Sequence, residues 1–282
     1  MPDGCLVRQD APALFALCDR IADKVGSPRA DGILVNGDYN AAFARVGMPR
    51  KTLLIIGLPM WLVQTWPERV ATLAHEFSHG ANGDCTRGLL VGSALDALEH
   101  WLDFLRPEYD SGSGAIVGNH LLWILSWPVH MLHLGLSHLV WSQSQLAEFL
   151  ADYLAITVAG SEAMIDDLRK IANGSHLGLF ASKSILGQQQ SGREVIEKFV
   201  SYYEGLPKGE LERLKRLSNQ ENARLDSTHP PTRQRIEFIA AHPELEPAII
   251  VNEADQVLIQ AELENEIETV GRQMICDWAP EL

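Results

Sequence analysis

Residues 66–82, with the sequence WPERVATLAHEFSHGAN, are the stretch that decides the fold. Pro67 and Glu68 are typical of the first turn of a helix, where proline loses no hydrogen bond and an acid is favoured. Apolar residues then recur every three or four positions to about Gly83. The stretch therefore predicts one amphipathic helix whose apolar face lies on the core.

A motif for metal chemistry lies inside this predicted helix, because residues 75–79 read His-Glu-Phe-Ser-His. Positions four apart lie one above the other on a helix. His75 and His79 can therefore reach one zinc ion, with Glu76 beside it as the general base of a hydrolase. The alternative is that two histidines share a half-exposed helix face by chance.

A third ligand is needed, because catalytic zinc typically has three protein ligands and a water. Glu148 and Asp152 follow residues 111–147, which contain no Asp, Glu, Lys or Arg. An acidic pair emerging from such a run needs a partner. We predict that Glu148 binds the metal and that Asp152, one turn on, accepts the ring N–H of a ligating histidine. Two solvent-facing acids are the alternative.

Together, HExxH and the later ExxxD resemble the gluzincin metallopeptidases, in particular the group of the HtpX heat-shock protease and the type I CAAX prenyl protease. Residues 40–44 are similar to the Asn-Ala-Phe edge-strand segment of that group, and residues 79–84 to its HxxxxD extension. Residues 228–236 resemble its distal His-Pro-Pro…Arg-Ile signature. Order and spacing agree from residue 40 to residue 236.

The resemblance implies one Zn²⁺ per chain, bound by two histidines and a glutamate. It also implies a general base, an orienting acid, and two residues that stabilise the oxyanion or hold the substrate backbone. The metal ligands are His75, His79 and Glu148, and the general base is Glu76. The orienting acid is Asp152, and the two residues for the oxyanion or the substrate backbone are His229 and Arg235. For the last two, a helix-start turn with a surface arginine is the alternative.

The resemblance further implies that an extended polypeptide substrate adds to an edge strand, main chain to main chain. The residues expected there are Asn40, Ala41, Ala42, Phe43 and Ala44. The implied activity is that of a zinc metalloendopeptidase acting on misfolded or membrane-associated proteins. A catalytically silent relative that binds peptides, and a non-proteolytic membrane protein with an incidental motif, are the rival readings.

The rest of the chain predicts an α+β fold that is predominantly helical and zincin-like, with a small antiparallel or mixed sheet packed on the HExxH helix. We expect a single domain over residues 1–282. Its parts are an N-terminal helix, sheet and HExxH helix, an uncharged hydrophobic helical pair as an insertion, a third-ligand helix with the distal motif, and an acidic tail. These parts are residues 11–105, 111–147, 148–241 and 242–282.

The uncharged run has three readings: a membrane span, a hairpin lying in a membrane, or a buried pair of helices. The pair would consist of residues 115–127 and 129–159, with Pro128 as the kink or turn. His130 precedes Glu148 by 18 residues, about five helical turns, and is predicted to line a cavity leading to the metal. Membrane association is expected through residues 115–141, with the active site facing the cytoplasm; a soluble cytoplasmic protein is the alternative.

Charge and cysteine content exclude other classes of protein. Lys and Arg number 23 against 37 Asp and Glu, so the net charge of −14 repels nucleic acid. The four cysteines form no CxxC pair, which fits a reducing compartment. The N-terminus has no basic segment followed by an apolar one, and we expect no cleaved signal. Nothing in the sequence predicts an oligomeric state.

Overall fold

The site is built on a three-stranded sheet and the helix that packs beside it. In this computed structural model the described residues are 1–47, 50–106, 113–174, 178, 180, 191–220 and 230–278. The strands are β1 (Gly32–Asn36), β2 (Ala41–Val46) and β3 (Lys51–Gly57), in the order β1-β3-β2. β1 runs parallel to β3 and β2 antiparallel to it, so the sheet is mixed.

The predicted HExxH helix is present as α3 (Trp66–Asn82). A capping box begins it. The Glu68 side chain accepts a hydrogen bond from the backbone N–H of Thr65, and the Thr65 side chain accepts one from the backbone N–H of Glu68. Gly83 ends it in the left-handed conformation, at φ 72°, which costs glycine nothing. Local sequence therefore fixes both ends of the helix.

α3 packs against the edge strand β2 through aromatic rings. Phe43 on β2 and Phe77 on α3 are both buried, with ring centroids 5.4 Å apart. The approach is close because Gly80 has no side chain. A Cβ at that position would lie 2.5 Å from Phe43 Cε1 and 2.5 Å from Ser27 Oγ. The metal-motif helix is thus held directly beside the strand that was expected to receive substrate.

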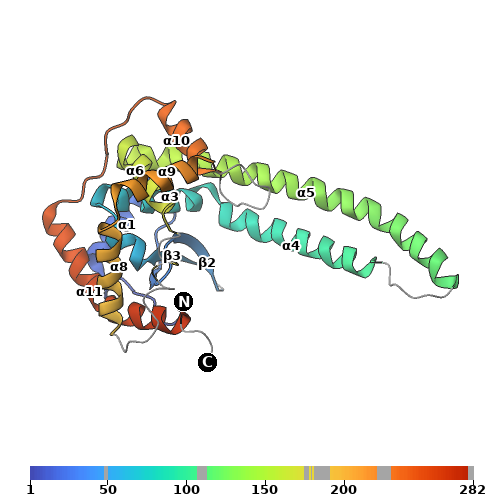
Figure 1. Ribbon diagram of the computed structural model, residues 1–282, viewed down its shortest axis with the longest axis horizontal. Coiled ribbons are helices and arrows are strands. Elements are labelled where there is room, and N and C mark those ends of the chain that lie inside the picture. Colours follow the sequence, from blue (N-terminus) through green and yellow to red (C-terminus); the bar gives the residue numbers. More distant parts are fainter. Residues whose placement is uncertain are drawn as a thin grey trace.

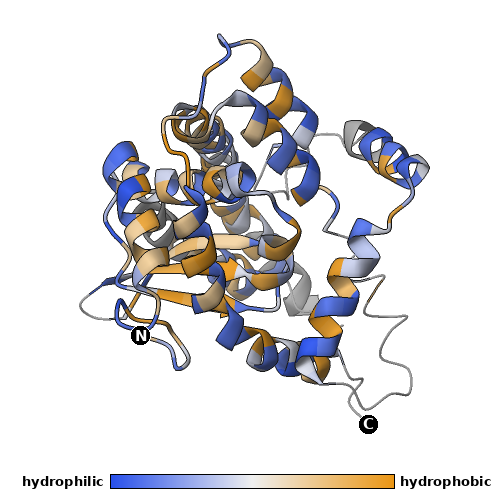
Figure 2. Cartoon of the chain, turned by 90° about the vertical axis from the view of Figure 1, so that its left-hand side faces the viewer, coloured by the Kyte–Doolittle hydropathy of each residue, from blue (hydrophilic) through white to orange (hydrophobic). Residues whose placement is uncertain are grey.

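Several of the other helices surround this pair and bury one apolar core (Figure 1). Figure 2 shows the strands in the interior with largely apolar colouring, and helices with polar outer faces around them. The helices are α1 (Pro12–Val25), α2 (Leu58–Val63), α4 (Asp84–Phe104), α5 (Ser113–Ala159), α6 (Ser161–Ile171), α8 (Gly192–Glu204), α9 (Lys208–Gln220), α10 (Thr232–Ala240) and α11 (Glu253–Trp278).

The predicted helical pair on either side of Pro128 is wrong. Residues 113–159 form one continuous helix, α5, with Pro128 inside it. A proline removes one backbone hydrogen bond and strains the turn before it, but a long helix tolerates this cost. α5 packs instead against α4, and the two form an arm that extends away from the body (Figure 1).

The arm does not bury its apolar side chains, which contradicts the reading as a buried pair. Trp123, Trp127 and Leu132 on α5, and Phe104 on α4, are all exposed. Among the helices that the structure describes, none meets the length and hydropathy needed to cross a bilayer.

His130 does not line a cavity leading to the predicted metal site. It is exposed and, with His133, lines a pocket of about 630 Å³ between α4 and α5. Eighteen residues of helix place it about 27 Å from Glu148 along the axis. His130 and Glu148 therefore share a helix face but do not line the same cavity.

The acidic tail contains a helix that is partly buried. α11 buries Ile259, Leu263 and Ile267 against the body and packs along α8 and α1. The Glu262 carboxylate accepts hydrogen bonds from the backbone N–H groups of Ala13 and Leu14, at 2.7 and 2.9 Å. An acid from the C-terminal helix thereby caps the first turn of α1.

Candidate metal centre

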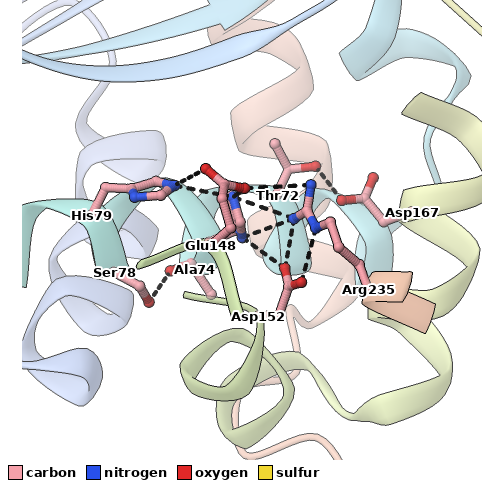
Figure 3. Close-up of polar contacts among 9 residues, drawn as sticks. Thr72, Ala74, Ser78, His79, Glu148, Asp152, Asp167 and Arg235 are labelled. Atoms are coloured by element: carbon pink, nitrogen blue, oxygen red, sulfur yellow. Dashed lines mark hydrogen bonds and ion pairs between the residues drawn. The ribbon is translucent and has the colours of Figure 1, made fainter. Parts of the chain in front are cut away.

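Two helices bring three ligand side chains to one point, as predicted. His75 and His79 are on α3, and Glu148 is on α5, which packs along α3. Figure 3 shows the side chains of His79 and Glu148 pointing toward each other. His75 Nε2 lies 3.2 Å from His79 Nε2 and 3.5 Å from Glu148 Oε2. His79 Nε2 lies 3.3 Å from Glu148 Oε1. Within the described part of the chain, this is the one group of three or more His, Cys, Asp or Glu residues arranged to hold a metal ion.

The spacing of these atoms fits a tetrahedral ion. Zinc binds nitrogen and oxygen ligands at about 2.1 Å. Tetrahedral geometry then separates the ligand atoms by about 3.4 Å. The observed separations of 3.2, 3.3 and 3.5 Å are close to that value, but the two distances to Glu148 end on different carboxylate oxygens. With one donor atom taken from each residue, the three atoms lie within 4.8 Å of one another. Two imidazoles and one carboxylate leave the fourth position for water, which is typical of catalytic zinc sites.

Asp152 fixes the orientation of the first histidine. Its Oδ1 lies 3.0 Å from His75 Nδ1, and the acid is completely buried. When Nδ1 carries the proton and donates to Asp152, the lone pair of His75 Nε2 faces the ligand point. Burial lowers the pKa of His75, but hydrogen bonds to Asp152 and Glu148 outweigh burial and raise it. The predicted role of Asp152 has geometric support.

The Arg235 guanidinium lies beside the ligand side chains, with Nη2 3.4 Å from His75 Nε2 and Nη1 3.6 Å from Glu148 Oε2. Its Nε donates to Asp152 Oδ2 at 2.8 Å, and its second nitrogen donates to Asp152 Oδ1 at 2.5 Å. Burial alone would raise the pKa of Asp152, but this guanidinium more than offsets burial and lowers it. Arg235 comes from α10, is buried, and braces Asp152 (Figure 3). The predicted contact of Arg235 with an oxyanion stays a prediction.

The structure describes all but one of the remaining predicted site residues. Glu76 follows His75 on α3 and is partly exposed, as a base that meets a water must be. β2, which contains residues 41–44, is at an edge of the sheet, and Asn40 precedes it. His229 lies outside the described residues.

A buried polar cluster next to the site was missed from the sequence. Asp167 on α6 accepts hydrogen bonds from Thr72 Oγ1 at 2.8 Å and from Gln64 Nε2 at 2.5 Å. Thr72 precedes His75 by three residues, so both lie on one face of α3. In the sequence, only the position of Thr72 on the helix face of His75 could have indicated this cluster, because no motif surrounds Asp167. Burial raises the pKa of Asp167 to about 7.

Comparison with known proteins identifies the family. The sequence profile of peptidase family M48 matches residues 8–242. The chain belongs to peptidase family M48. This M48 chain is 25% identical over 237 residues to a Protease HtpX homolog of Pyrobaculum calidifontis, covering 82% of the chain and 68% of that relative. It is 28% identical over 166 residues to Protease HtpX of Haemophilus ducreyi, covering 56% of the chain and 57% of the relative.

No solved structure matches the chain. The predicted HtpX-like family is confirmed, and an M48 peptidase is a metalloprotease. The His75, His79 and Glu148 group gives this M48 chain a place for the metal.

Proposed function

We propose that the protein is a zinc-dependent endopeptidase with one Zn²⁺ on His75, His79 and Glu148. The observation that carries the proposal is the convergence of one donor atom from each of these three side chains, all within 4.8 Å of one another. A donor set of two histidines and a carboxylate is also one that zinc proteases use. When bound, zinc polarises a carbonyl oxygen and lowers the pKa of its water to about 7.

Three side chains then have distinct roles in the reaction. Glu76 takes the proton of the attacking water and passes it to the leaving amine. Asp152 holds His75 in the tautomer that leaves Nε2 free to bind the metal. Arg235 holds Asp152 and compensates its buried charge, so it is a positioning residue.

We propose that an extended segment of a misfolded or membrane-associated polypeptide lies along β2. Only β3 pairs with β2 in the sheet that the structure describes, so the other edge of β2 carries backbone N–H and C=O groups for a further strand. Main-chain pairing of this kind reads the backbone of the substrate more than its side chains. It suits a protease that acts on unfolded chains.

Metal content and proteolysis test the proposal together. Wild-type protein should contain one zinc per chain and digest casein, and a chelator should abolish the digestion. Glu76→Gln should keep the zinc and lose the activity, because the ligands remain while the base is gone. His79→Ala should lose both. Full casein digestion by Glu76→Gln, or one zinc retained by His79→Ala, would refute the assignment.

We also propose that the tip of the α4–α5 arm rests at a membrane surface, with the active site on the cytoplasmic side. Trp101 and Phe104 on α4, and Trp123 and Trp127 on α5, are exposed there. Such aromatic rings favour the membrane interface. Flotation with phospholipid vesicles should carry the wild type upward and leave the double variant Trp123→Glu with Trp127→Glu at the bottom. Equal flotation of both proteins would contradict the proposal.

A further inference from the structure

α5 carries a long exposed row of apolar side chains at a strict spacing of seven. The residues are Leu125, Leu132, Leu139, Leu146 and Tyr153, and they are between 40% and 61% exposed. Four residues after each of the first four lie Val129, Leu136, Gln143 and Leu150. We call these nine positions the seam. Eight are apolar, and they alternate three and four apart as the a and d positions of a coiled coil do.

The seam lies apart from the contacts that α5 makes inside the chain. Ser126, His130 and His133 face α4 across a pocket, and Glu148, which points away from Leu146 and Leu150, faces the metal site. At 1.5 Å per residue the seam is about 42 Å long. It is therefore a continuous exposed flank that runs from the arm onto the body, where its last residue, Tyr153, contacts the His242 ring with centroids 5.3 Å apart.

The spacing fits a helix as the partner better than a bilayer. A row kept at seven residues drifts about 20° per heptad around a straight helix, so it stays in contact with a second helix through a left-handed supercoil. Lipid imposes no such period. Moreover, beyond Leu134 every exposed large apolar side chain among the described residues of α5 lies on the seam. The aromatic tip of the arm is a separate surface.

Charge and the one polar seam position favour another copy of this chain. The protein has a net charge of −14, yet residues 111–147 contain no formal charge, so two copies can approach along this helix without repulsion. Gln143 is exposed at an inner seam position. A single polar residue at such a position specifies register and oligomer state by pairing with its counterpart. A twofold axis would place the same surface on both copies.

We propose that two copies of the chain pair through the α5 seam as a coiled coil. The ligands and Glu76 lie off the seam, so pairing leaves the metal site intact. This proposal rests on the arm and stands whether or not the chain binds zinc.

Paired charge substitutions test it. The seam variant is Leu132→Glu with Leu139→Glu. The matched control is Ile124→Glu with Leu134→Glu, which adds the same charge to exposed apolar positions off the seam. Sedimentation of the full chain from about 1 to about 100 µM, with and without a mild non-ionic detergent, spans the affinities that helix pairs of this size show. Circular dichroism confirms that each variant is folded.

Wild type and control should reach twice the 31.2 kDa chain mass, and the seam variant should associate at least tenfold more weakly. The proposal is overturned if the wild type stays at one chain throughout, or if the seam variant associates as well as the wild type. It is also overturned if the control loses association equally, which is what general coverage by lipid or detergent predicts.

A cross-linking pair tests the contact itself. Leu139 is the midpoint of the seam, so full overlap in either direction places it near its own copy. In a chain with Cys5, Cys85 and Cys276 replaced by serine, Leu139→Cys should be joined between copies by a short bismaleimide. Leu134→Cys, on the opposite face, should not be joined. Cross-linking at position 134 alone, or equally at both positions, would overturn the proposal.

Discussion

Asp167→Asn should change how the stability of the protein depends on pH. Asp167 is completely buried, and burial raises its pKa from 3.8 to about 7. Between these two values the folded chain keeps a proton that the unfolded chain releases. The free energy of unfolding therefore falls as pH rises through this window, which is the reverse of the usual effect of an ion-paired acid.

The magnitude follows from the shift. About three pKa units at 1.36 kcal/mol each give about 4 kcal/mol over the whole window. Between pH 5 and pH 8 the loss is about 3 kcal/mol. Asparagine cannot ionise, so this slope should vanish. Its amide can also donate to Gln64 Oε1, which has no hydrogen-bond partner among the described residues.

Urea unfolding of the metal-free chain at pH 5 and pH 8 measures the effect, and chelator in both buffers removes metal binding from the comparison. Stability of Asp167→Asn relative to the wild type should rise by about 3 kcal/mol from pH 5 to pH 8. Asp166→Asn is the matched control, because Asp166 is only partly buried, with 46% of its side chain exposed, and pairs with the exposed Arg169. A relative stability of Asp167→Asn that is the same at both pH values would refute the reasoning.

Three further predictions concern the site and its supports. Asp152→Asn should weaken zinc affinity about 10- to 100-fold in a competition titration, because the acceptor that orients His75 loses its negative charge; unchanged affinity would count against the role of Asp152. Gly80→Ala should destabilise the fold by about 1–3 kcal/mol in urea, since its Cβ would lie 2.5 Å from the buried Phe43 ring, while Gly92→Ala, with open space at its Cβ, is the control. Glu262→Ala should cost about 0.5–2 kcal/mol by removing both backbone contacts at the start of α1, and an unchanged unfolding midpoint would show that water replaces the carboxylate.

Much of the site could be predicted because its motifs are local. Spacing of four on a helix aligns His75 with His79, and Glu148 with Asp152, whatever the rest of the chain does. The bounds of the HExxH helix also followed from its first-turn residues and from Gly83. Reasoning by periodicity failed at Pro128, where the long helix outweighs one lost hydrogen bond, and at His130, whose shared face with Glu148 leads to the arm pocket and not to the metal.

The sequence by itself predicted the donor set, the helix that presents two of its members, and the family. Only the tertiary structure decided that Glu148 meets the two histidines, that Arg235 braces Asp152, and that Asp167 joins Thr72 and Gln64. The physical reason is how far apart in the sequence the contacting residues lie. Helical geometry fixes the direction of side chains a few residues apart, whereas contacts between residues 69 to 160 apart depend on how helices pack.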